Sequence, residues 1–125
     1  MAGARILLCD DHDALRSLAV RILSSEGHEV VGVASAGEAL ERLAAERFDL
    51  LVLDLHLGTN SGLAVLDDAP AARPPVLLMS GDFDPREGQR DAARYGVQAT
   101  LAKPFDAREI SAAVASLLGD ATPPR

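Results

Sequence analysis

The sequence predicts an α/β protein in which five parallel strands form one doubly wound sheet covered by five helices. Short apolar runs alternate along the 125 residues with segments whose apolar residues recur at helical spacing. The apolar runs lack a regular polar face, which is typical of strands buried on both sides of a parallel sheet. Parallel neighbours need right-handed crossovers, and the helical segments supply them.

The first half of the chain contains three of the predicted strands and two of the helices. The strands are expected at residues 6–9, 29–33 and 50–53, and the first helix at residues 13–25. Gly27 follows that helix as a stop signal. Ser35 and Glu38 have the spacing of a capping box, which predicts that the second helix begins directly after Ser35.

The second half contains the remaining elements. A loop is expected over 58–62, a short helix over 61–68, a strand over 75–79, a helix over 85–95 and a strand over 97–102. Gly88 weakens the helix over 85–95 by about 1 kcal/mol relative to alanine. Asp106 and Glu109 form a second capping box, and Gly119 ends the last helix. We expect one domain over residues 1–119 and a flexible tail over 120–125, which contains two prolines.

Composition excludes several classes of function. The net charge is −7, from 12 basic and 19 acidic residues, whereas binding to nucleic acid or to an anionic membrane needs clustered Lys and Arg. No apolar run approaches the roughly 20 residues that span a bilayer. The single cysteine, Cys9, lies in an apolar run and predicts a buried, reduced thiol. A cytoplasmic location is the simplest interpretation.

Carboxylate, hydroxyl or ammonium side chains directly follow four of the predicted strands. Asp10 and Asp11 follow the first, Asp54 the third, Ser80 the fourth and Lys103 the fifth. The carboxyl ends of parallel strands meet at one edge of a sheet, so these side chains should converge. Clustered carboxylates repel one another, and a hard divalent cation such as Mg²⁺ relieves that repulsion. One carboxylate could then attack phosphorus, while the lysine and the hydroxyl stabilise the transferred group.

These motifs resemble those of the receiver domain of two-component response regulators, a flavodoxin-like fold of the chemotaxis type. The resemblance covers about residues 5–119 and rests on the segments LLCDDHD, LLVLDLHLGTNSG, VLLMSG and LAKPF, in that order. It implies a cytoplasmic signalling domain that accepts a phosphoryl group from a sensor histidine kinase or a phosphotransfer protein. Phosphorylation would then switch a surface that binds a downstream protein, without nucleic acid or membrane as partner.

The resemblance also implies a role for each residue at the strand ends. Asp54 would be the phospho-acceptor, and Asp11 would ligate Mg²⁺ together with Asp54 and the backbone carbonyl of His56. Asp10 would act through a metal-bound water. The catalytic set would be completed by a lysine that pairs with the phosphoryl group and a hydroxyl that binds it after transfer, at Lys103 and Ser80. The bond from Lys103 to Pro104 is cis in this family.

The sequence departs from the family pattern at several positions. Gly58 stands where proline is usual, Ser61 where an acid is common, and Thr100 where the family carries an aromatic switch residue. His56 and Asp82 stand at positions that border the phosphoryl site and tune its lifetime in the family. The three histidines, at positions 12, 28 and 56, show no metal-ligand spacing.

Two other classes of function compete with the phospho-accepting one. The first is a Mg²⁺-dependent hydrolase that forms an aspartyl phosphate, because residues 11–13 read D-x-D; this class leaves Asp54 without a role. The second is a receiver-like scaffold that is never phosphorylated, against which the complete acidic set argues. Under the leading interpretation the chain is not an enzyme, apart from catalysing its own phosphoryl transfer and dephosphorylation.

Overall fold

The computed structural model describes residues 3–57, 60–70, 73–81, 94–103 and 105–119. The predicted helix over 85–95 lies almost entirely outside these ranges, as do Asp82, Pro104 and the tail over 120–125. None of the described helices combines the length and the apolar character that a membrane span requires.

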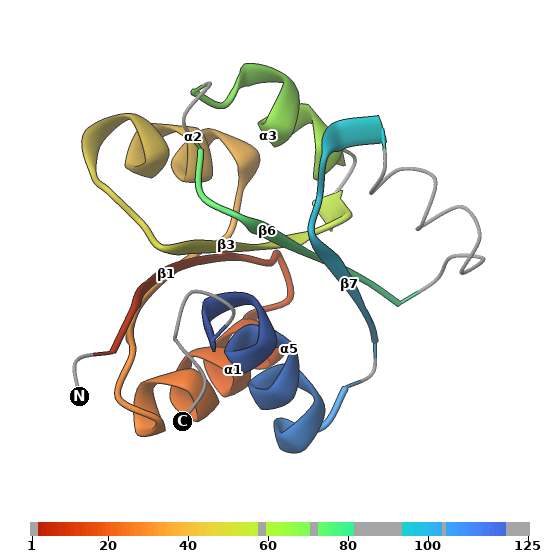
Figure 1. The fold of residues 1–125 in the computed structure, drawn as a ribbon. Helices are drawn as coiled ribbons and strands as arrows, with labels where there is room; N and C mark the ends of the chain where they lie inside the picture. The colour runs from red at the N-terminus through yellow and green to blue at the C-terminus, as the bar shows by residue number, and fades with distance from the viewer. Residues whose placement is uncertain (1–2, 58–59, 71–72, 82–93, 104, 120–125) are drawn as a thin grey trace.

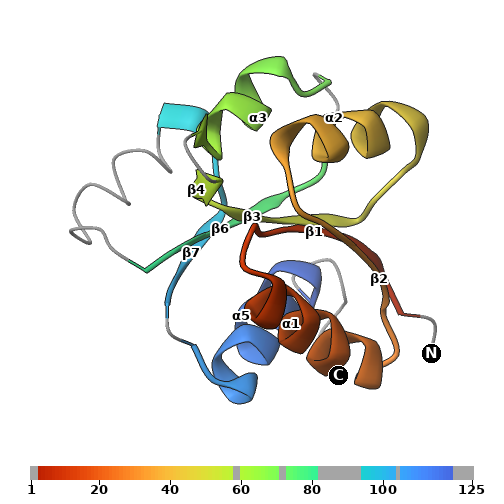
Figure 2. The ribbon, with the colours of Figure 1, turned by 180° about the vertical axis from the view of Figure 1, so that it is seen from behind.

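The predicted parallel sheet is confirmed. Its five strands run in the order β2 (Glu29–Val33), β1 (Arg5–Cys9), β3 (Leu50–Asp54), β6 (Val76–Ser80) and β7 (Ala99–Ala102), and all neighbours are parallel. One face is covered by α1 (Asp13–Ser25) and α5 (Ala107–Gly119), and the other by α2 (Ala36–Ala45) and α3 (Leu63–Asp68), as Figures 1 and 2 show. This is the doubly wound, flavodoxin-like strand order.

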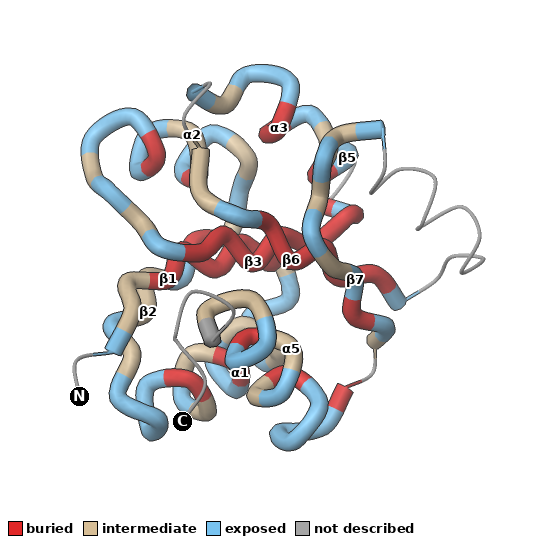
Figure 3. The backbone as a smooth tube through the Cα atoms, viewed as in Figure 1, coloured by how far each residue is buried: buried red, intermediate tan, exposed pale blue. Residues whose placement is uncertain are grey.

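Alternating side chains of the central strands build two separate cores. In β1, Ile6 and Leu8 pack toward α1 and α5, whereas Leu7 and Cys9 pack toward α2 and α3. The same alternation continues through β3 and β6, whose residues are all buried. Figure 3 shows this buried band along the middle of the sheet. The unbroken apolar runs in the sequence therefore reflect burial on both faces.

Local signals set most helix ends as predicted. The hydroxyl of Ser35 accepts a hydrogen bond from the Glu38 N–H at 3.2 Å, at the start of α2. Asp106 and Glu109 each accept a hydrogen bond from the other's backbone N–H, at 2.8 and 3.0 Å, which completes the second capping box. Gly27 has a positive φ of 93° just after α1, a conformation that glycine adopts at little cost.

The loop predicted over 58–62 is wrong at residues 60–61, which lie in a strand. The chain instead forms a small antiparallel pair, β4 (His56–Leu57) with β5 (Asn60–Ser61). The short helix α3 consequently starts at Leu63, and the Ser61 hydroxyl accepts a hydrogen bond from the Leu63 N–H at 3.1 Å. β7 begins two residues later than predicted, since its pairing with β6 starts at Ala99.

Gly62 returns the β4–β5 pair to the end of β3. Its N–H donates to the Leu55 carbonyl at 2.6 Å. A Cβ atom at this position would stand 1.9 Å from the carbonyl oxygen of Asp54, so even a methyl group would displace backbone. The position of the Asp54 backbone thus depends on a glycine eight residues further along the chain.

We expect Gly62→Ala to lower the free energy of unfolding by about 1–3 kcal/mol, the usual cost of overpacking a site that cannot yield. Gly37→Ala is the matched control, because a Cβ at Gly37 meets nothing within 4 Å. Its stability should equal or exceed that of the wild type, since alanine is the better helix former. Urea unfolding of both variants makes the comparison, and an unchanged midpoint for Gly62→Ala would contradict the proposed overlap.

Candidate functional site

The predicted site residues lie at the carboxyl edge of the sheet, where the strand order reverses. The chain passes from β1 to β2 on one side and then crosses to β3 on the other side of β1. Asp10 directly follows β1 and Asp54 is the last residue of β3, so the two carboxylates come from neighbouring strands. Such a switch point is where open α/β sheets bind their ligands.

Lys103 joins these two carboxylates. Its Nζ lies 2.9 Å from Oδ2 of Asp10 and 2.9 Å from Oδ2 of Asp54. The three side chains are between 1% and 8% exposed, so the ion pairs are almost completely removed from water. Lys103 directly follows β7, and its N–H donates to the Ser80 carbonyl at 2.8 Å. The end of the β6–β7 pair therefore fixes the base of the lysine side chain.

The second oxygen of each carboxylate is held by the backbone. Oδ1 of Asp10 accepts a hydrogen bond from the His12 N–H at 2.9 Å, and Oδ1 of Asp54 accepts one from the His56 N–H at 3.1 Å. Each aspartate thus closes a turn two residues ahead of itself. With one oxygen toward the ammonium and the other toward a backbone donor, both carboxylates have a fixed orientation.

Burial and the shared ammonium act in opposite directions on these groups. Burial raises the pKa of Asp54 above its usual value and outweighs the effect of Lys103. Burial also acts to raise the pKa of Asp10, but the Lys103 and His12 hydrogen bonds outweigh it and leave that pKa lowered. Burial acts to lower the pKa of Lys103, but the two carboxylates raise it overall. The ammonium is therefore charged, and Asp54 is the more basic of the two buried carboxylates.

Asp11 and Ser80 complete the predicted set. The Asp11 side chain is 32% exposed and is thus less buried than those of Asp10 and Asp54. Ser80 is the last residue of β6 and is 1% exposed. The structure thus brings Asp10, Asp11, Asp54, Ser80 and Lys103 to one edge of the sheet, as the sequence predicted.

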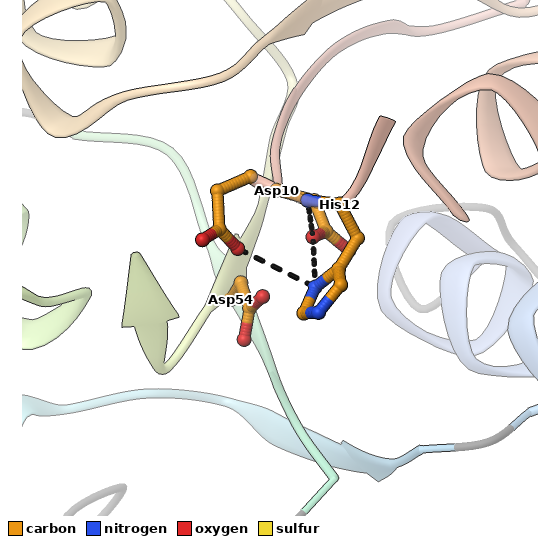
Figure 4. Close-up of side chains that lie close together, drawn as sticks. Asp10, His12 and Asp54 are labelled. Carbon is orange, nitrogen blue, oxygen red and sulfur yellow. Dashed lines mark hydrogen bonds and ion pairs between the residues drawn. The ribbon is translucent and has the colours of Figure 1, made fainter. Parts of the chain in front are cut away.

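Histidine 12 is the member of this site that the sequence did not indicate. Side-chain ligand atoms of Asp10, Asp11, His12 and Asp54 all lie within 4.8 Å of one another. Figure 4 shows the imidazole ring beside the carboxylates of Asp10 and Asp54. The spacing of the histidines along the sequence did not indicate His12 as a ligand, and its approach to Asp54 depends on the pairing of β1 with β3. Its one local signal is its position directly after the acidic pair.

Other predicted positions lie outside the pocket or contribute only backbone. The side chain of His56 is exposed, and Thr100 is exposed on β7. His28 is remote from the site, and its Nδ1 accepts a hydrogen bond from the Ala4 N–H at 3.0 Å. Burial, followed by the charges of Asp10 and Asp54, raises the pKa of Cys9 to about 12, so this thiol remains protonated and inert.

The donor set suits a hard divalent cation. Ligands on opposite sides of an octahedral ion stand about 4.2 Å apart when each metal–oxygen distance is about 2.1 Å. The observed limit of 4.8 Å is close to that spacing. Asp11, Asp54 and Asp10 supply carboxylate oxygens, which are the ligands that Mg²⁺ prefers. The residues therefore fit a magnesium site.

Comparison with known proteins agrees with this geometry. The family model of the response regulator receiver domain matches residues 6–115. The sensory/regulatory protein RpfC of Xanthomonas campestris is 34% identical over 119 residues, which make up 90% of this chain and 16% of RpfC. The response regulator protein FleR of Pseudomonas aeruginosa is 37% identical over 110 residues, or 86% of this chain and 23% of FleR. The chain therefore spans less than a quarter of either relative.

Solved structures agree as well. A CheY-like response regulator receiver domain protein from Methanospirillum hungatei superposes with a TM-score of 0.87 at 28% identity, over 95% of this chain and 96% of that one. NtrX from Brucella abortus superposes with a TM-score of 0.84 at 34% identity, over 96% of this chain and 28% of that one. Together with the acidic pocket at the switch point, the family match shows that this chain belongs to the receiver domains of two-component response regulators.

Proposed function

We propose that the chain accepts a phosphoryl group on Asp54 and is switched by it. The observation that carries the proposal is the environment of Asp54: a carboxylate buried at the end of a central strand, oriented by the His56 N–H and paired with Lys103. A buried carboxylate with a raised pKa is a better nucleophile than a solvated one. The donor would be a sensor histidine kinase or a phosphotransfer protein, as the family membership suggests.

In the transfer, a carboxylate oxygen of Asp54 attacks the phosphorus of a phosphohistidine. The bond between phosphorus and the imidazole nitrogen breaks, its electron pair returns to the imidazole, and an acyl phosphate forms. The Lys103 ammonium is already at the acceptor and can follow the charge onto the phosphoryl oxygens. Ser80 is the last residue of the neighbouring strand β6, and we propose that its hydroxyl donates a hydrogen bond to one of these oxygens.

The proposed cofactor is Mg²⁺, held by Asp11, Asp54 and the backbone carbonyl of His56, with Asp10 acting through a bound water. When bound, the ion neutralises negative charge on the phosphoryl group and on the acidic cluster. The Oδ2 atoms of Asp10 and Asp54 face Lys103, whereas ligand atoms of the acidic cluster gather near His12. The lysine and the ion can therefore use different edges of the same carboxylates.

The alternative of an aspartyl-phosphate hydrolase has less support. In that class the nucleophile would lie on the D-x-D motif that begins at Asp11. Lys103 instead contacts Asp54 and Asp10, and the Asp11 side chain is the more exposed of the three carboxylates. We therefore assign self-catalysed transfer and dephosphorylation on Asp54, and no further enzymatic activity.

Output would differ from that of relatives with an aromatic switch residue. Thr100 is exposed on β7, is too small to fill a large space and, being β-branched, has few rotamers. We infer that phosphorylation acts mainly through Ser80 and Lys103, which are close to the new charge, on a surface that binds a downstream protein.

The first test concerns the acceptor. Asp54→Asn should reduce labelling by acetyl phosphate and Mg²⁺ to background, because an amide is not a nucleophile toward phosphorus. Intact mass followed by peptide mapping measures it, with Asp67→Asn, an exposed aspartate on α3, as the control that labels normally. Labelling of Asp54→Asn at the wild-type rate would contradict the assignment, and labelling on Asp11 would favour the hydrolase.

The second test concerns the metal. Asp11→Ala should weaken Mg²⁺ binding by at least about tenfold, since loss of an outer-shell partner alone costs 10–100-fold. Phosphorylation should slow in parallel. Calorimetric titration measures the affinity and acetyl phosphate labelling the rate. An unchanged Mg²⁺ affinity would rule out Asp11 as a ligand.

The third test separates the lysine from the metal. Lys103→Met should not weaken Mg²⁺ binding, because the ammonium competes with the cation for negative charge rather than supporting it. Phosphoryl transfer should nevertheless slow at saturating Mg²⁺, since the variant lacks the charge that follows the phosphoryl group. If transfer stayed at the wild-type rate, Lys103 would have no role in the reaction.

A further inference from the structure

The side chain of His12 is in an unusual position for the residue that starts a helix. His12 occupies the N-cap of α1, where side chains commonly accept a hydrogen bond from the helix, yet its side chain makes no capping hydrogen bond. The ring is turned back toward the acidic pocket. Nδ1 lies 3.3 Å from Oδ1 of Asp10 and 3.4 Å from Oδ1 of Asp11, while the side chain remains 65% exposed.

These distances are longer than a charge-assisted hydrogen bond, which brings nitrogen and oxygen to about 2.7–2.9 Å. One ring nitrogen is shared almost equally between oxygens of two different carboxylates. Two carboxylate oxygens and one ring nitrogen therefore converge on one place, and a cation bound there would relieve the repulsion between the carboxylates.

The position of Lys103 leaves the carboxylate oxygens beside His12 available to a cation. The ammonium contacts Oδ2 of Asp10 and Oδ2 of Asp54, whereas Nδ1 of His12 faces Oδ1 of Asp10. A cation bound beside His12 therefore need not displace the Lys103 ammonium. The four candidate ligand atoms, from Asp10, Asp11, His12 and Asp54, already lie within 4.8 Å of one another.

We propose that the imidazole of His12 is a metal ligand, which makes the pocket a mixed nitrogen and oxygen site and raises its affinity for Co²⁺, Ni²⁺ or Zn²⁺ relative to Mg²⁺. This inference rests on the metal pocket of the proposed function and concerns which metals it accepts. Imidazole is a good ligand for these ions, whereas Mg²⁺ prefers oxygen and retains its waters. A pocket of carboxylates alone lacks this nitrogen ligand.

The experiment compares two metals on three proteins. Co²⁺ and Mg²⁺ are titrated into the wild-type chain, His12→Asn and the control His28→Asn, whose histidine is remote from the pocket. In His12→Asn the Co²⁺ affinity should fall at least about tenfold relative to the Mg²⁺ affinity, judged by the 10–100-fold cost of losing even an outer-shell partner. His28→Asn should keep the wild-type ratio. An unchanged ratio in His12→Asn would overturn the proposal.

A second measurement uses the wild-type chain and so does not depend on the folding of a variant. One equivalent of Zn²⁺ is added to ¹⁵N-labelled protein, and the histidine ring nitrogens are followed by long-range ¹H–¹⁵N correlation. A large shift of one His12 ring nitrogen with Zn²⁺, and little change with Mg²⁺, supports the proposal. Binding of Zn²⁺ that leaves the His12 ring unperturbed overturns it.

These results are independent of the phosphorylation test. Failure of the wild-type chain to be labelled on Asp54 with Mg²⁺ would reject the proposed function while leaving a His12-dependent metal preference intact. Normal labelling on Asp54, together with a Co²⁺ to Mg²⁺ affinity ratio that is the same in His12→Asn as in the wild type, would reject only this inference.

Discussion

The structure of the site depends on one buried ammonium shared by two buried carboxylates. Transferring such charges out of water costs several kcal/mol per ion, and only close geometry repays it. Here the geometry is close, with Nζ of Lys103 at 2.9 Å from both Asp10 and Asp54. Apolar replacements of buried ion pairs are often as stable as the pair itself, so stability alone does not account for this triad. The phosphoryl transfer proposed for Asp54 would account for it, because that proposal gives each member of the triad a part in the reaction.

The doubly wound sheet is what makes such a triad possible. Its central strands are buried on both faces, so their carboxyl ends are rigid and side by side. The turns that follow supply backbone N–H groups to Asp10 and Asp54, which fixes the second oxygen of each. Gly62 permits the chain to return against the Asp54 carbonyl. The apolar layers therefore provide stability, and the strand ends provide polar groups in fixed orientations.

His12 shows how the same scaffold can vary its chemistry. The residue starts α1 but turns its ring toward the carboxylates rather than toward the helix. It changes the ligands available at the pocket without altering a strand, a buried side chain or the lysine contact. An exposed position next to a buried site is a place where ligand preference can change at little structural cost.

The sequence alone determined the sheet, its burial on both faces, two capping boxes and the five residues at the strand ends. It did so because each of these features has a local signal. The signals are a run of apolar residues, a capping residue followed three positions later by glutamate, and a polar residue directly after a strand. The folded structure decided what depends on contacts between separate elements, whether these are near or far apart in the chain. The β4–β5 pair, the overlap that requires Gly62, the sharing of Lys103 between two strands and the approach of His12 to Asp54 all join residues from different elements. No spacing along the chain encodes such a distance, because the packing of separate strands and helices sets it.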